Sequence, residues 1–231
     1  MTKFTSRAML LAAAMSVAPG VFAQKGVTEG PFTKTFTIGG RASYLPLGSM
    51  LMKPSSAPIS NAGLHGTKKF GGGAALELSF KRKFGLDLDA IYRAVGFWTV
   101  TDTDIATTVL QTKARYYDFP LTFRYNYFGR TGFASHLFVR GGVALRKVSN
   151  LKTTRDVTDN EGNTASGPTG SPLNHGTVRG LVAGGGMRFR DDFGIKVTPE
   201  VRYTRWMAQT FSTAPFMAKR DQLEVVVGIT F

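Results

Sequence analysis

The chain has 231 residues, of which 42% are hydrophobic and 19% charged, and its formal net charge is +14. This balance is not that of a disordered chain, which is poorer in hydrophobic residues. The sequence has no cysteine, which excludes a disulfide framework, an iron–sulfur cluster and a thiolate zinc site. After residue 25, no apolar run approaches the roughly 18 residues that a membrane-spanning helix needs.

The first 23 residues are typical of a secretory signal peptide. Two basic residues precede an apolar stretch over residues 8–18, and Val21-Phe22-Ala23 then places small residues at the −3 and −1 positions of a cleavage site. We therefore expect residues 1–23 to be an export signal and residues 24–231 to be the mature domain.

The rest of the chain alternates hydrophobic and polar residues with a period of two, which is typical of β-strands. The alternation is clearest near the end, where Leu223, Val225 and Val227 share one parity. Eight strands are predicted, at about 34–44, 71–82, 84–93, 117–127, 135–147, 177–190, 193–204 and 222–231. Long polar loops are expected at about 45–69, 99–112, 148–176 and 207–220. Short turns alternate with these loops, so one end of the molecule carries turns and the other carries loops.

Charged residues gather on one parity of these strands, and the other parity has almost none over mid-strand. Six acids and eight bases make a nearly balanced set: Arg41, Glu77, Asp87, Asp89, Arg93, Asp118, Arg124, Arg140, Arg146, Arg188, Lys196, Glu200, Arg202 and Glu224. A soluble barrel of the lipocalin kind would turn this face outward. A membrane barrel would turn it into the lumen and expose the apolar face to lipid.

Two features favour the membrane barrel. Aromatic residues cluster where strands meet the short turns, as in an interfacial girdle: Phe80, Phe84, Tyr127, Phe133, Phe189, Phe193 and Phe231. The strands are also long enough for a tilted membrane crossing, which takes about 9–11 residues. The predicted fold class is all-β, an eight-stranded antiparallel up-and-down transmembrane β-barrel.

Three segments carry a resemblance to known proteins. The run Gln222-Leu223-Glu224-Val225-Val226-Val227-Gly228-Ile229-Thr230-Phe231 resembles the C-terminal insertion signal of bacterial outer-membrane proteins, in which the barrel-assembly machinery recognises a terminal aromatic residue. Residues 116–125 (YYDFPLTFRY) and 198–206 (TPEVRYTRW) are similar to the outer-membrane β-barrel domain family of small bacterial barrels. The resemblance covers about 30–231. It implies the cell outer membrane of a Gram-negative-type envelope, and it usually implies no assigned reaction.

The lumen of such a barrel is just wide enough for side chains to fill it. We therefore expect the fourteen charged residues to form an ion-pair network, and the function to be that of a structural or interaction scaffold that displays extracellular loops. The alternative is a small porin-like channel or conduit for small solutes, which the glycine runs, for example Gly71-Gly72-Gly73, would favour. A soluble lipocalin-like carrier and a lipid-modifying enzyme rank below both.

Catalysis has little support in the sequence. The histidines His65, His136 and His175 have no metal-ligand spacing, and Ser135 and His136 are adjacent on a strand and so point to opposite faces. We expect no enzyme activity, no metal and no cofactor. A nucleic-acid partner is not expected either, because the basic residues form no contiguous helix or stacking platform.

Four basic residues share the lipid-facing parity at the loop ends of the strands: Lys113, Arg115, Arg179 and Arg205. They are candidates to reach the phosphates of lipopolysaccharide, although simple solvation at strand ends would also account for them. The expected partners are outer-membrane lipid and lipopolysaccharide, the barrel-assembly machinery during insertion, and an unidentified extracellular ligand at loops 45–69 and 148–176.

Overall fold

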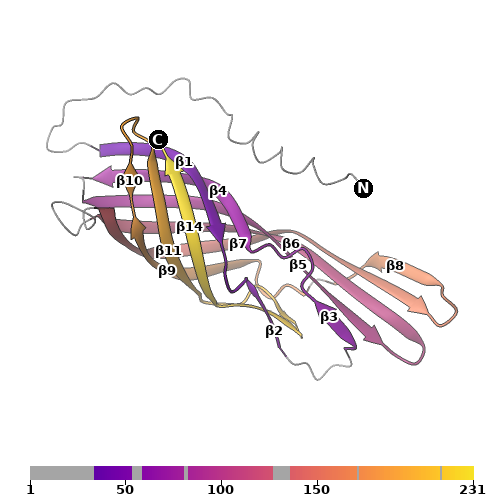
Figure 1. The fold of residues 1–231 in the computed structure, drawn as a ribbon. Coiled ribbons are helices and arrows are strands. Elements are labelled where there is room, and N and C mark those ends of the chain that lie inside the picture. The colour runs from indigo at the N-terminus through magenta and orange to yellow at the C-terminus, as the bar shows by residue number, and fades with distance from the viewer. Residues whose placement is uncertain (1–33, 54–58, 81–82, 127–135, 171, 214) are drawn as a thin grey trace, which may run out of the picture. The chain divides into compact units, whose positions relative to one another are not determined.

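Eight long antiparallel strands form a closed ring (Figure 1). The computed structural model describes residues 34–53, 59–80, 83–126, 136–170, 172–213 and 215–231. The ring strands are β1 (Lys34–Tyr44), β4 (Phe70–Phe80), β5 (Phe84–Asp102), β6 (Ala106–Asn126), β7 (Leu137–Asp159), β9 (Thr177–Met187), β11 (Lys196–Trp206) and β14 (Asp221–Thr230). Each pairs with the next, and β14 pairs with β1 to close the ring. The predicted eight-stranded barrel is confirmed.

The expected signal peptide at residues 1–23 and the aromatic residues Tyr127 and Phe133 lie outside the described residues. No helix in the described part of the chain is long and apolar enough to cross a membrane.

The register of the ring sets its stagger. A path along paired residues that starts at Lys34 returns to the same strand at Tyr44, ten residues further on. The path passes through Phe80, Phe84, Tyr125, Val139, Gly185, Val201 and Val225. Such a stagger over eight strands tilts them by about 40° and lifts the register by a little more than one residue per strand.

The two ends of the barrel differ. We call the end that holds the start of β1, the end of β14 and the β4–β5 connection the turn end, and the opposite end the loop end. At the loop end, a small sheet is formed by β2 (Met50–Met52), β12 (Ser212–Thr213) and β13 (Phe216–Ala218). At the turn end, β10 (Phe189–Arg190) pairs with β11.

Two of the expected loops are largely strand. The sequence predicts loops at 99–112 and 148–176, but β5 and β6 continue to a turn at 103–105, and β7 runs on to Asp159. With β3 (Asn61–Gly63) and β8 (Thr164–Pro168), these extensions form an open sheet that we call the arm (residues 61–63, 98–111 and 151–168) (Figure 1). The prediction failed there because the arm is rich in threonine. Threonine suits a strand, yet it gives no hydrophobic alternation.

The outward face of the barrel is apolar and the inward face is polar. Exposed hydrophobic residues occupy the outward parity of every ring strand, among them Ile38, Leu76, Leu88, Leu121, Val143, Leu181, Val201 and Val225. The inward parity holds buried charged and hydroxyl side chains. A soluble barrel has the opposite arrangement, whereas a lipid-facing barrel requires this one.

Aromatic side chains of the predicted girdle lie at the turn end. Phe84 packs against Phe123 and Tyr125, with ring centroids 5.6 and 5.4 Å apart. Phe189, Phe193 and Phe231 are exposed there as well. This is the position in which aromatic rings flank the apolar band of a membrane barrel.

Gly73 provides a test of how tightly neighbouring strands approach. It lies on the inward parity of β4, where a Cβ atom would overlap the backbone carbonyl of Ala90 on β5. Because a backbone atom cannot move aside cheaply, Gly73→Ala should lower the free energy of unfolding by about 1–3 kcal/mol. Urea titration of the refolded barrel in detergent would measure this.

Gly72→Ala is the matched control. A Cβ atom there would lie 3.7 Å from the nearest atom, the carbonyl oxygen of Arg41, so this variant should unfold like the wild type. Equal destabilisation by the two substitutions would contradict the close-approach explanation.

Candidate functional site

Charged side chains fill the middle of the lumen in two networks. The larger lies toward the turn end, and the register explains its form. Glu77 on β4 stands directly opposite Asp87 on β5, and Arg124 on β6 stands opposite Arg140 on β7. The two neighbouring carboxylates on β4 and β5 therefore face the two neighbouring guanidinium groups on β6 and β7. Each like-charged pair is neutralised by the other pair.

The contacts within the larger network are short and interlocking. Arg124 Nη1 lies 2.9 Å from Asp87 Oδ1 and 3.3 Å from Glu77 Oε2, so it bridges both carboxylates. Arg140 Nη2 lies 3.2 Å from Asp87 Oδ2 and 2.8 Å from Glu200 Oε2. Each of these two arginines thus contacts two carboxylates from different strands. The ion pairs therefore connect strands across the lumen as well as strands that are hydrogen-bonded neighbours.

The same network continues across the other side of the barrel. Arg41 Nη2 lies 2.9 Å from Glu77 Oε1, and Arg41 Nε lies 3.2 Å from Asp89 Oδ1. Arg202 Nη2 is 2.6 Å from Asp89 Oδ2 and 2.5 Å from Glu200 Oε1. Strands β1, β4, β5 and β11 are joined by these four contacts.

The smaller network lies nearer the loop end. Asp118 accepts hydrogen bonds from both Arg93 and Arg146, the latter at 2.6 and 2.8 Å. Arg93 also donates to Glu224, at 2.5 Å. The guanidinium of Arg146 lies between two aromatic rings, 4.3 Å from the ring centre of Tyr116 and 4.1 Å from that of Trp206. This aromatic clamp is a cation–π arrangement.

Buried charges in the two networks balance. Six arginines with less than 5% exposure (41, 93, 124, 140, 146 and 202) face six buried carboxylates (77, 87, 89, 118, 200 and 224). Arg188 reaches Glu77 Oε2 at 2.6 Å from a position that is 17% exposed. Lys196 is half-buried at the turn end, and no described carboxylate lies within ion-pair distance of it. The structure thus brings thirteen of the fourteen charged residues into ion pairs.

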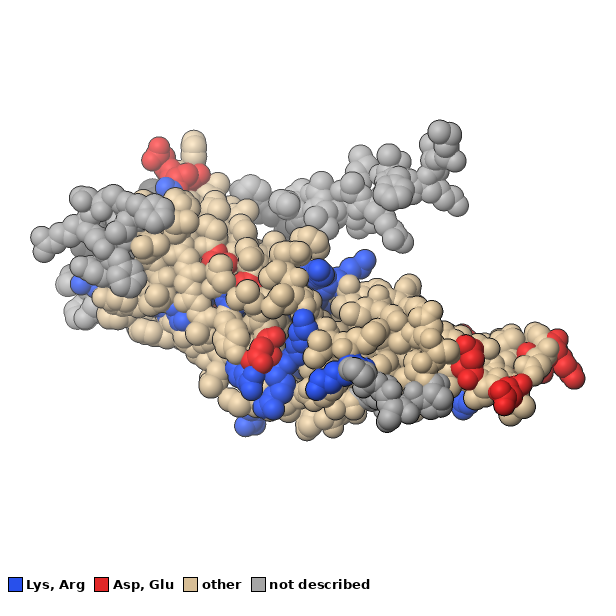
Figure 2. All heavy atoms as spheres, turned by 60° about the horizontal axis from the view of Figure 1, so that its bottom comes forward, with Lys and Arg blue, Asp and Glu red and all other residues tan. Residues whose placement is uncertain are grey.

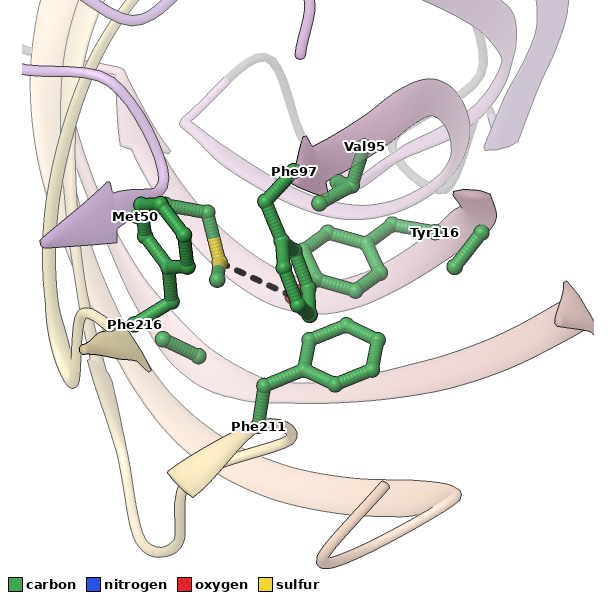
Figure 3. Packing of buried hydrophobic residues seen from close by; sticks show 8 residues of the cluster. Met50, Val95, Phe97, Tyr116, Phe211 and Phe216 are labelled. Atoms are coloured by element: carbon green, nitrogen blue, oxygen red, sulfur yellow. Dashed lines mark hydrogen bonds between the residues drawn. The ribbon is translucent and has the colours of Figure 1, made fainter. Parts of the chain in front are cut away.

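An apolar cluster that sequence reasoning missed lies at the loop end of the lumen, and we call it the seal. It consists of Met50, Val95, Phe97, Ala114, Tyr116, Phe211, Phe216 and Ala218. Figure 3 shows the ring of Phe97 among those of Phe211, Phe216 and Tyr116. Its ring centroid is 5.5 Å from that of Phe211 and 5.1 Å from that of Phe216. The small sheet of β2, β12 and β13 supplies Met50, Phe216 and Ala218, so the loops fold back onto the barrel wall.

One sequence signal could have indicated the seal. On β5 the inward parity carries charge as far as Arg93 and then changes to Val95 and Phe97. Inward apolar side chains are stabilised by apolar neighbours. The loops at this end could therefore have been expected to supply such neighbours.

A cavity of about 10 Å³ lies between the smaller and the larger network. It is lined by Ile91, Asp118, Pro120, Ala144, Arg202, Thr204, Trp206, Gln222 and Glu224. Such a volume holds about one water molecule.

The remaining candidate residues lie elsewhere. Lys113, Arg115, Arg179 and Arg205 are exposed on the outward face at the loop end, and Arg205 pairs with Asp221. His136 donates a hydrogen bond to the carbonyl of Arg188 at 2.9 Å, and His175 donates to that of Gln209 at 3.1 Å. Among the described residues, no group of three or more His, Asp or Glu side chains is placed to hold a metal ion. The backbone N–H of Phe231 donates to Ile38 at 3.0 Å, and its side chain is exposed.

An apolar outward face, tilted strands and an ion-paired interior together define a transmembrane β-barrel of the outer-membrane type. No protein-family model matches this chain, and no curated protein matches it in sequence. Solved structures do show a likeness of fold, at low sequence identity.

Three of these structures are outer-membrane barrels. Outer membrane protein AlkL, solved in DMPC lipid bilayers, has a TM-score of 0.48 and 12% identity over 90% of this chain and 94% of its own. OprG from Pseudomonas aeruginosa has a TM-score of 0.41 and 11% identity over 84% of this chain and 93% of its own. Ail of Yersinia pestis, solved with the heparin analogue sucrose octasulfate, has a TM-score of 0.36 and 11% identity over 87% of this chain and 100% of its own.

Asp118→Ala tests whether the buried networks hold the barrel together. It would leave Arg93 and Arg146 buried without their shared carboxylate, which should lower the free energy of unfolding by about 3–5 kcal/mol. The control is Asp221→Ala, which removes the exposed partner of Arg205 and should change stability little. Chemical unfolding in one detergent compares the two, and equal effects would contradict a structural role for the lumen.

Proposed function

We propose that this protein is an outer-membrane scaffold whose lumen is filled and whose working surface is the arm and the loops around it. The observation that carries the proposal is the filled lumen. Ion pairs cross it in two networks, and an apolar seal covers its loop end. Continuous aqueous conduction would require many of these contacts to part, which disfavours the alternative of a porin-like conduit.

The arm supports a role in display. Strands β5, β6 and β7 remain hydrogen-bonded far beyond the barrel wall, so the arm is a rigid extension rather than a flexible tether. At its tip, the side-chain and backbone amides of Asn163 hold the pKa of the Asp159 carboxyl below its usual range. The carboxylate is thereby kept charged and bonded to the tight turn that it caps, with its Oδ1 2.8 Å from the Asn163 nitrogen.

Export, insertion and anchoring complete the proposal. Residues 1–23 would direct export, and the strand that ends at Phe231 would be recognised by the barrel-assembly machinery. Lipid contacts the apolar outward face, and lipopolysaccharide is the proposed partner of Lys113, Arg115, Arg179 and Arg205. The proposal includes no catalytic group and no cofactor.

Single-channel recording of the refolded mature protein, residues 24–231, tests the proposal in a planar bilayer. We expect insertion without steady current, because the lumen is filled by paired side chains. Folding is checked by heat-modifiable mobility on a denaturing gel, and insertion by protection from protease. A reproducible conductance that changes with Arg124→Gln or Glu200→Gln would instead identify the lumen as a pathway.

A further inference from the structure

Six basic residues lie close together on the outward face, and we call them the basic stripe. Its members are Lys113 and Arg115 on β6, Lys147 and Lys152 on β7, Arg179 on β9 and Arg205 on β11. All six are exposed at the loop end. Figure 2 shows Lys and Arg side chains gathered in a band across the middle of the molecule, with acidic side chains at the end of the arm.

The register makes these residues neighbours. Lys113 stands directly opposite Lys152. Tyr117 stands opposite Lys147, so Arg115, two residues before Tyr117, is the diagonal neighbour of Lys147. Diagonal neighbours on a sheet lie within reach of long side chains.

The row continues in the same way over the next two strands. Thr177 stands opposite Lys147, so Arg179, two residues after Thr177 on β9, is the diagonal neighbour of Lys147. Leu181 stands opposite Arg205, which makes Arg205 the diagonal neighbour of Arg179 on β11.

The strand tilt brings this diagonal closer to the plane of the barrel rim. Each step from Arg115 to Arg205 moves two residues toward the turn end. The ten-residue stagger lifts the register by a little more than one residue per strand in the opposite sense. The stagger offsets more than half of each step, so the line from Arg115 to Arg205 runs at a shallow angle to the rim of the barrel and hence to the membrane plane.

The stripe lies where the apolar belt ends. Toward the turn end it is followed by the outward-facing side chains of Tyr92, Tyr117, Leu145 and Leu181. Arg115 extends over the ring of Tyr92, 6.0 Å from its centre. Tyrosine at the edge of an apolar belt marks the membrane interface, so the basic groups reach the level of lipid head groups.

The stripe lacks the counter-charges that the lumen has. In the described part of the chain, no carboxylate lies within ion-pair distance of Lys113, Arg115, Lys147, Lys152 or Arg179, and only Arg205 has one, Asp221. Like charges directly opposite one another, as Lys113 and Lys152 are, destabilise a sheet. An external anion with several charges would relieve the repulsion along the whole row.

We propose that the basic stripe binds the phosphate groups of lipopolysaccharide in the outer leaflet. This inference rests on the outer-membrane location given under the proposed function, and it extends the predicted contacts to Lys147 and Lys152. A lipid with more than one phosphate at head-group level matches a group of exposed bases beside an apolar wall. Arginine and lysine both form strong charge-assisted bonds with phosphate oxygens.

The test measures the thermal stability of the full mature protein in nanodiscs. Heat-modifiable mobility on a denaturing gel gives Tm in phospholipid discs with and without lipopolysaccharide. A ligand that binds the folded state raises Tm. The stripe variant is Arg115→Ser/Lys147→Ser/Arg179→Ser. We expect lipopolysaccharide to raise the Tm of the wild type, the variant to lose most of that rise, and the lipopolysaccharide retained per barrel to fall about ten-fold or more.

The control variant is Lys53→Ser/Arg155→Ser/Arg190→Ser, which removes the same charge from exposed positions in a loop, on the arm and at the turn end, outside the stripe. It should keep the rise in Tm. Dephosphorylated lipopolysaccharide should give no rise in the wild type. Equal loss of stability by the stripe variant in discs with and without lipopolysaccharide would overturn the proposal, and so would an undiminished rise in that variant.

A further measurement adds soluble heparin to discs that lack lipopolysaccharide. A rise in Tm equal to that from lipopolysaccharide would identify the stripe as a site for soluble polyanions and overturn the lipid assignment. The outcome is separable from that of the proposed function. A barrel that inserts without current but gains nothing from lipopolysaccharide contradicts only the stripe, whereas a conducting barrel contradicts only the scaffold.

Discussion

Charge balance inside a closed barrel is the constraint on which the rest of this structure depends. Eight strands with a stagger of ten residues enclose a space that only side chains can fill. Once lipid requires the apolar parity to face outward, the polar parity must satisfy itself within that space. Six buried arginines and six buried carboxylates do so, and each arginine of the central set reaches acids on two strands. The networks therefore act as the core that an oily interior supplies in a soluble protein.

The loop end follows from the same constraint. Above Arg93 the inward residues of β5 become Val95 and Phe97, which could not be left facing water. The loops supply Met50, Phe211 and Phe216 to cover them, and the aromatic clamp on Arg146 joins the seal to the smaller network below it. Beyond this end of the wall, continued strand pairing extends β5, β6 and β7 as the arm.

The strands were predicted correctly where the alternation of hydrophobic and polar residues reflects which side chains face lipid and which face the lumen. The prediction failed where the sequence has no such alternation. The strand predicted at 34–44 coincides with β1, and the inward parity was assigned from charge together with the aromatic girdle and the strand lengths. The arm was missed because both of its faces meet solvent. Residues such as Thr107 and Thr108 therefore show no alternation in hydropathy along the strand. The seal was missed because it joins residues as distant as Met50 and Phe216, and no local pattern encodes that contact. Lys152 was left out of the basic set because it fell in a segment taken for a loop.

The barrel has two populations of basic residues, and the side of the sheet on which they lie distinguishes them. Arg146 and Arg179 lie on adjacent strands near the same end. Arg146 points inward and is fully committed to Asp118, Gln222 and two aromatic rings, whereas Arg179 points outward with no described acid in range. A one-residue change of register would exchange these environments. The buried arginines therefore have their partners within the chain, whereas in the described part of the chain the stripe has only Asp221, at Arg205.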